Sequence, residues 1–188
     1  MDKILLHICC APCSVACIKQ LREEGLEPTG FWYNTNIHPY QEYKARRDTL
    51  IEYAASIELP LIVKDEYGLK KFTQAVSNHI DKRCGYCYAV RFEEAAKTAK
   101  EQGFQAFATT LTVSPYQDHP LIFEIGRKAA EKYGVEFLPY DFSPKFREGQ
   151  AEARELGMYM QKYCGCIYSE EDRYQKQIEK DQKKFQLI

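Results

Sequence analysis

The sequence contains no run of apolar residues long enough to span a membrane. A transmembrane helix needs about 20 consecutive apolar residues, and the first apolar stretch, residues 4–6, already ends at His7. The start of the chain also lacks the pattern of a secretory signal peptide, because cysteines follow this stretch at once. These absences predict a cytoplasmic protein without membrane contacts.

Neither sign of charge dominates the sequence. Its 188 residues include 26 Lys and Arg against 27 Asp and Glu, which gives a formal net charge of -1. This overall charge does not indicate a nucleic-acid binder, so any surface for RNA must come from a local basic patch. Apolar residues make up 45%, and no internal repeat, low-complexity segment or linker divides the sequence. We therefore expect one domain, residues 1–188, with a full core.

Apolar segments of strand length alternate with segments of helical periodicity. Strands are predicted at residues 4–8, 29–33, 61–64, 106–109 and 135–138. Helices are predicted at 14–24, 40–57, 84–102 and 119–133, with a short helix or irregular insertion at 66–79 and a helical C-terminal part in which residues 164–166 separate two helices. This alternation predicts an α/β fold, a Rossmann-like parallel sheet with helices on both faces. Such a sheet binds ligands at the carboxyl ends of its strands.

Eight cysteines are many for a cytosolic chain of this size. In a reducing compartment, and with a full core available, they indicate metal binding or redox chemistry rather than disulfides. Seven of them form three clusters: Cys9, Cys10 and Cys13; Cys84 and Cys87; Cys164 and Cys166. The eighth, Cys17, stands among apolar residues, and we expect it to be a small buried core residue.

The position of each cluster suggests what its thiols can do. Cys84 and Cys87 open a predicted helix, whose N-terminal amides favour the thiolate form that binds metals. Cys9 and Cys10 leave a strand in different directions, so they can serve two metal centres, or one centre and one substrate. Cys164 and Cys166 are too closely spaced for both thiolates to bind one metal ion easily, although the backbone freedom of Gly165 makes such a turn possible.

Two metals are compatible with clustered thiolates. Structural zinc commonly takes two pairs of the CxxC type, but this chain has one such pair, and its histidines do not add a zinc spacing. Seven thiols also exceed the four that a zinc site needs. Soft thiolate sites otherwise select iron–sulfur clusters. The sequence therefore favours an iron–sulfur protein, with a zinc-stabilised binding module as the alternative.

Several other residues follow predicted strands and are candidates for substrate contact. The loop after the fourth strand carries hydroxyls at Thr110, Ser114 and Tyr116, which suit a ribose, base or phosphate, although plain loop chemistry also explains them. Asp141 follows the fifth strand as an acid, a metal ligand or a helix cap. His7 lies within the first strand, where a hydrogen-bonded core histidine is expected. Basic residues near the cysteine loops would suit phosphates: Lys82, Arg83, Arg91, Lys145 and Arg147.

Four segments of the sequence together resemble one known family. They are LLHICCAPCS (residues 5–14), RCGYCYAVR (83–91), TTLTVSPY (109–116) and YCGCIYS (163–169). In this order they resemble the QueH family of cobalamin-independent epoxyqueuosine reductases. The resemblance implies a fold of the HUP or PP-loop type and the reduction of epoxyqueuosine to queuosine in the anticodon loop of tRNA. It also implies a 4Fe–4S cluster with a neighbouring iron ion.

The resemblance extends residue by residue to the clustered cysteines and not to Cys17. It leads us to expect metal ligands at Cys9, Cys10, Cys84, Cys87, Cys164 and Cys166. We expect Cys13 and Asp141 to be catalytic. Substrate contacts are expected at Arg83, Arg91, Thr110, Ser114 and Tyr116. Because a cluster passes one electron at a time, an external donor such as ferredoxin or flavodoxin is implied.

A tRNA-thiolating enzyme of similar fold, which would use a cluster to carry sulfur, is the second interpretation of these motifs. PP-loop enzymes of that kind bind ATP through a glycine-rich loop after the first strand. Here the segment from Cys9 to Ser14 occupies that place. This difference argues against ATP as a cosubstrate.

Overall fold

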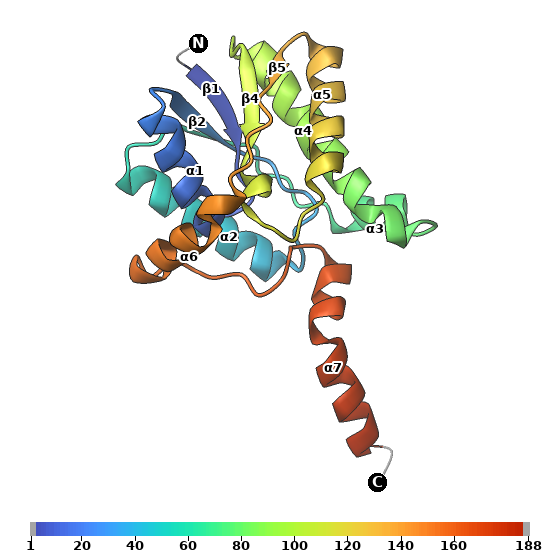
Figure 1. Cartoon of the computed structure of the whole chain (residues 1–188). Coiled ribbons are helices and arrows are strands. Elements are labelled where there is room, and N and C mark those ends of the chain that lie inside the picture. The colour runs from blue at the N-terminus through green and yellow to red at the C-terminus, as the bar shows by residue number, and fades with distance from the viewer. Residues whose placement is uncertain (1–2, 186–188) are drawn as a thin grey trace.

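The computed structural model describes residues 3–185 and contains a five-stranded sheet in the order β3-β2-β1-β4-β5 (Figure 1). The strands are β1 (Lys3–His7), β2 (Glu27–Trp32), β3 (Leu61–Val63), β4 (Ala106–Thr109) and β5 (Glu136–Phe137). All four strand pairs are parallel. The chain moves outward from β1 to β3 and then crosses to β4 on the other side of β1. The carboxyl ends of β1 and β4 therefore form the switch point of a doubly wound sheet.

Helices cover both faces of the sheet, as the alternating pattern predicts. They are α1 (Ala11–Glu23), α2 (Tyr40–Ser56), α3 (Leu69–Val76), α4 (Arg83–Glu101), α5 (His119–Tyr133), α6 (Phe146–Glu155) and α7 (Ile167–Phe185). In Figure 1, α1, α2 and α6 lie on one side of the sheet, and α4 and α5 pack together on the other. The α/β fold with a parallel sheet and two helical layers is confirmed.

The central strands are buried because helices cover both of their faces. Ile4, Leu5 and Leu6 of β1 have no exposed surface, and Phe107 of β4 lies beside them in the core. A parallel strand in this position consists of a continuous apolar run rather than an alternating one. This explains why residues 4–6 give a clear strand signal.

The largest differences from the predicted elements lie near the cysteines. The first helix begins at Ala11 rather than at residue 14, because Pro12 fits its first turn. Cys13 therefore belongs to the helix, and Cys10 takes its N-cap position. The insertion at 66–79 contains the helix α3. Residues 156–166 are not helical, so Cys164 and Cys166 lie on a loop between α6 and α7.

This loop is called the cysteine loop below, and one glycine in it has a specific role. Gly165 has φ of +152°, a conformation that other residues rarely adopt. A Cβ at this position would also lie 3.3 Å from Ile37 Cγ1 and 3.4 Å from Arg46 Nη1. Glycine thus lets the two cysteines turn tightly against the body of the protein.

The last helix stands apart from the packed layers. Figure 1 shows α7 projecting away from the sheet, and no residue of α7 is buried within the described chain. Helix α7 continues to Phe185. Across residues 3–185, no helix is both long and apolar enough to cross a membrane.

Candidate active site

His7 connects three strand ends at the switch point. Its Nδ1 lies 2.9 Å from Thr109 Oγ1 at the end of β4, and its Nε2 lies 3.3 Å from Asn34 Oδ1 after β2. The amide of Asn34 in turn donates to the carbonyl of Ile8 at 2.9 Å. Burial lowers the pKa of His7 to about 3, so the imidazole is neutral at physiological pH. The prediction of a hydrogen-bonded core histidine is confirmed.

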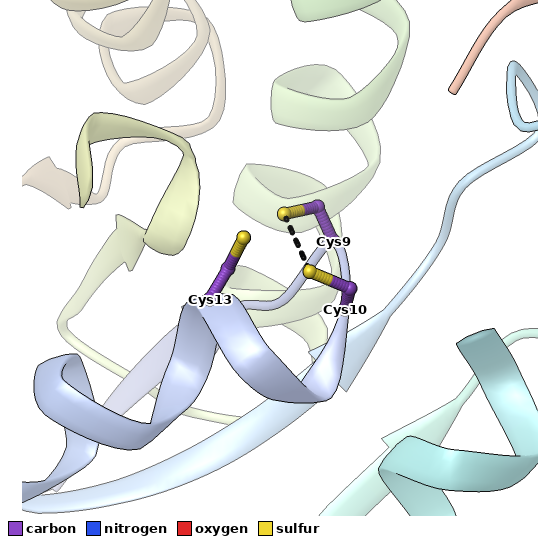
Figure 2. A group of neighbouring side chains, drawn as sticks. All are labelled: Cys9, Cys10 and Cys13. Carbon is purple, nitrogen blue, oxygen red and sulfur yellow. Dashed lines mark hydrogen bonds between the residues drawn. The ribbon is translucent and has the colours of Figure 1, made fainter. Parts of the chain in front are cut away.

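The first cysteine cluster forms a compact group of sulfurs directly above β1. The Sγ atoms of Cys9, Cys10 and Cys13 all lie within 4.8 Å of one another, and all three residues are buried. Figure 2 shows their side chains converging, with 3.9 Å between the sulfurs of Cys9 and Cys10. We call these residues the thiol triad. Thiolates are soft ligands, so the triad can hold a metal ion.

The triad favours negative charge at one of its sulfurs. Hydrogen bonds from Cys10 and Cys13 hold the pKa of the Cys9 thiol well below its usual range. Thr110 Oγ1 adds a contact at 3.6 Å to Cys9 Sγ and accepts from the Cys9 amide at 3.3 Å. By contrast, the neighbouring thiols and burial raise the pKa of the Cys13 thiol well above its usual value. These directions favour the charged form at Cys9 over the charged form at Cys13.

The other four clustered cysteines surround a second space. Cys84, Cys87, Cys164 and Cys166 line one cavity of about 660 Å³, which we call the four-thiol cavity. Two of them come from the first turn of α4 and two from the cysteine loop, so residues distant in sequence meet here. Burial raises the pKa of Cys87 to about 12, which outweighs the effect expected from the helix N-terminus.

The thiol triad borders its own cavity, and the two cavities are neighbours. This triad cavity, of about 360 Å³, is lined by Cys9 and Cys13 and by the expected substrate residues Thr110, Ser114 and Tyr116. Tyr116, Gln117 and Cys164 line both cavities. The fold thus brings all three cysteine clusters to one end of the sheet, although they start 9, 84 and 164 residues into the chain.

Two glutamines contact the thiols and were not predicted as site residues. Gln161 Nε2 donates to Cys10 Sγ at 2.9 Å and reaches Cys13 Sγ at 3.4 Å. Gln117 Nε2 donates to Cys164 Sγ at 3.3 Å, while its Oε1 accepts from Tyr88 OH at 2.7 Å. The sequence offered one signal for both glutamines: each lies within three residues of one of the four segments that resemble the family.

Arg91 is buried, whereas the sequence placed it among the basic residues expected to face RNA. Its side chain is 2% exposed, because it lies one helical turn after Cys87 on the inner face of α4. The guanidinium donates to Asn36 Oδ1 at 2.7 Å and to Cys87 Sγ at 2.9 Å. Arg91 is thus part of the thiol site and not of an exposed basic face.

A second buried arginine anchors the cysteine loop. Arg46 pairs with Glu42 at 2.6 Å and donates to the carbonyls of Tyr163 and Cys164 at 2.9 and 2.8 Å. Sequence reasoning missed it, because an i,i+4 Glu–Arg pair on a helix usually faces solvent. Arg83 is half-buried and lines the four-thiol cavity, where it pairs with Asp172 at 2.6 Å.

Asp141 and Cys17 lie away from the two cavities. The Asp141 carboxylate is exposed, accepts from the Ser143 amide at 2.9 Å and lies 3.6 Å from His119 Nδ1. Asp141 lines neither cavity, so the structure does not bring this residue, expected to be catalytic, to the thiols. Cys17 is fully buried and donates to the Cys13 carbonyl at 3.1 Å, which confirms it as a core residue.

The donor set fits a resident metal centre. Seven thiols lie around the two cavities, and three buried polar atoms beside them have no hydrogen-bond partner within residues 3–185: Arg83 Nε, Arg91 Nη1 and Gln161 Oε1. Buried polar groups are nearly always paired. An anionic metal–thiolate centre would supply acceptors for the two unpaired guanidinium nitrogens and use the soft donors that surround it.

Fold and site together define a class: Rossmann-like α/β proteins with a cluster of thiols, able to hold a metal, at the switch point of the sheet. A solved structure described as a predicted subunit of a tRNA methyltransferase from Methanocaldococcus jannaschii matches with a TM-score of 0.53. It covers 81% of this chain and 76% of its own at 13% identity, so it supports the fold alone.

Sequence comparison identifies the family within this class. The family model described as Epoxyqueuosine reductase QueH matches residues 4–172. Curated relatives of that description include proteins from Dehalococcoides mccartyi, 33% identical with 93% of this chain and 96% of the relative covered, and from Thermotoga maritima, 35% identical with 98% of each covered. The chain belongs to the epoxyqueuosine reductase QueH family, an oxidoreductase family, as the four sequence segments indicate.

Proposed function

We propose that this chain reduces epoxyqueuosine to queuosine in the anticodon loop of tRNA. The observation that carries the proposal is the convergence of seven cysteines from three segments around two adjacent cavities. Family membership supports the substrate, since the relatives are described as epoxyqueuosine reductases. Losing the epoxide oxygen as water takes two electrons and two protons, and the site must supply both.

We assign the two thiol groups to two metal centres. Cys84, Cys87, Cys164 and Cys166 offer the four ligands that a 4Fe–4S cluster takes. Two thiolates on one tetrahedral ion with bonds of about 2.3 Å stand about 3.8 Å apart, and the sulfurs of Cys9 and Cys10 are 3.9 Å apart. This spacing supports a single iron ion at Cys9 and Cys10. When bound, these centres supply electrons one at a time, from a donor of the ferredoxin or flavodoxin class.

The triad cavity is the substrate pocket in this proposal. Thr110 and Ser114 present hydroxyls to a ribose or base, and Cys13 lines the same space with a thiol that holds a proton at Sγ. Tyr116 is 86% exposed at the rim, with its ring set edge-on to Phe146. An exposed aromatic ring in this position suits stacking on a base of a single-stranded loop. Because Cys164 lines both cavities, substrate and four-thiol site are adjacent.

A reconstitution assay tests the proposed function. Protein reconstituted anaerobically with iron and sulfide is given epoxyqueuosine-containing tRNA and a strong reductant, without cobalamin or ATP, and nucleosides are analysed by mass spectrometry. Queuosine is the expected product. An untouched epoxide with iron-replete protein would refute the assignment, and ATP-dependent insertion of sulfur would establish the thiolating alternative.

A further inference from the structure

Arg91 is a buried cation that lacks a carboxylate counter-ion. Arg46, the other fully buried arginine, is neutralised by Glu42 at 2.6 Å. Within residues 3–185, no carboxylate pairs with Arg91, and its side chain is 2% exposed. An uncompensated charge in a protein interior costs several kcal/mol. The compensating negative charge for Arg91 must therefore come from the thiol site.

The hydrogen bonds of Arg91 direct its charge at one sulfur. Its Nη2 donates to Cys87 Sγ at 2.9 Å, and the Asn36 amide donates to the same sulfur at 3.0 Å. Asn36 Oδ1 accepts from Arg91 Nε at 2.7 Å, so the asparagine fixes the guanidinium and adds a second N–H to Cys87. The remaining nitrogen, Nη1, has no partner in the described part of the chain.

The position of Arg91 also matters for the neighbouring cavity. Cys87, to which Arg91 donates, lines the four-thiol cavity together with Cys164. Cys164 lines the wall that the two cavities share. Arg91 is therefore a buried cation beside the four-thiol cavity, which adjoins the triad cavity.

We propose that Arg91, oriented by Asn36, is the positioning residue that balances the charge of the metal centre at Cys87 and sets its reduction potential. The inference rests on the metal centre assigned under the proposed function. Reduction of that centre takes one electron from an external reductant and adds no atom, so the reduced form carries one more negative charge. A fixed cation and two N–H donors on a ligand sulfur stabilise the reduced form more than the oxidised form.

Four variants of the anaerobically reconstituted full chain test this role through the midpoint potential, measured by redox titration followed by EPR. Arg91→Met removes the charge and should shift the potential to more negative values. Arg91→Lys keeps the charge, so its midpoint potential should be closer to that of the parent than the potential of Arg91→Met is. Arg47→Met is the matched control, because it removes an arginine that pairs with Asp48 and Asp65, and it should leave the potential unchanged.

Asn36→Asp, the fourth variant, tests the same role without deleting the arginine. The two side chains are nearly equal in size, so this variant decides the question if Arg91→Met does not fold. A carboxylate at position 36 would pair with Arg91 and replace the N–H on Cys87 with an acceptor, which should also make the potential more negative. Potentials equal to that of the parent in both variants, with full iron and sulfide content, would overturn the inference. If the parent itself holds no iron, the proposed metal centre fails instead.

Discussion

Gln161 Nε2 donates a hydrogen bond of 2.9 Å to Cys10 Sγ, although 151 residues separate the two in the chain. Cys10 is the N-cap residue of α1, and Gln161 belongs to the cysteine loop before α7. The hydrogen bond ties this loop to the thiol triad and closes one side of the triad cavity. A side-chain amide that donates to a ligand sulfur stabilises its negative charge and orients it.

Replacing Gln161 should weaken the metal site of the triad. Gln161→Leu keeps much of the volume but removes both N–H interactions with Cys10 and Cys13. Loss of such supporting hydrogen bonds typically costs about 10- to 100-fold in metal affinity. Iron retained per chain, measured against a graded chelator, should fall accordingly. Gln150→Leu is the control, because Gln150 lines the same cavity but donates to no thiol within residues 3–185; an equal loss in both variants would contradict the prediction.

The four-thiol cavity predicts which cysteines are indispensable for the cluster. Cys84→Ser or Cys87→Ser should abolish iron and labile sulfide binding, since each removes a ligand from a set of four. Cys17→Ser should retain both, because Cys17 donates to a backbone carbonyl in the core and a serine hydroxyl can do the same. Iron and sulfide analysis after anaerobic reconstitution measures the difference. Equal loss in Cys17→Ser and Cys84→Ser would show that the thiol grouping is wrong.

The Arg46–Glu42 pair predicts a stability effect of a different kind. Arg46→Met would leave Glu42 unpaired at a position where both side chains are buried, which typically costs about 3–5 kcal/mol. The carbonyls of Tyr163 and Cys164 would also lose their donors. Urea unfolding under anaerobic conditions measures the change. Lys128→Met, which breaks an exposed pair with Glu124, should cost at most about 1 kcal/mol.

Buried His7 predicts how stability depends on pH. Burial lowers its folded-state pKa to about 3, well below the ordinary value of 6.5, so the unfolded chain binds one more proton between these values. The contribution of neutral His7 to the free energy of unfolding is fully present above pH 6.5. It is lost as pH falls towards 3, by about 1.4 kcal/mol per pH unit. His7→Gln should therefore show a shallower loss of stability than the parent between pH 6 and pH 4 in urea titrations, and a loss as steep as that of the parent would contradict the prediction.

Sequence patterns predicted the sheet, and they placed the first cysteine cluster beside the loop after β4, for a physical reason. The division of the seven thiols between two cavities was not predicted. Parallel strands buried on both faces give short apolar runs, and their carboxyl ends meet, so residues after β1 and β4 had to be neighbours. The charged and amide partners of the thiols could not be found in this way. Whether Arg91 faces solvent or core depends on the rotation of α4 against the sheet. The spacing of four residues from Cys87 was the one local signal that they share a face.

Exposed basic residues near the cavities should bind tRNA without affecting the thiols. Lys82 lines the four-thiol cavity and Arg147 is exposed on α6, and neither has a carboxylate partner within residues 3–185. By contrast, Arg83 pairs with Asp172 and Lys145 with Glu148. Because the net charge is only -1, RNA affinity has to come from such local groups and should fall steeply with salt.

The double variant Lys82→Ala/Arg147→Ala tests this surface. Its affinity for tRNA should be lower, and the slope of log affinity against log salt should become shallower by about 1 for each phosphate that the variant no longer neutralises. Iron and sulfide content should match the parent, because neither side chain is hydrogen-bonded to a thiol in the described structure. Lys128→Ala on α5 is the matched control, and it removes a lysine that pairs with Glu124. An unchanged salt slope in the double variant would exclude this face as the tRNA-binding surface, since the slope reports the number of phosphates that the protein neutralises.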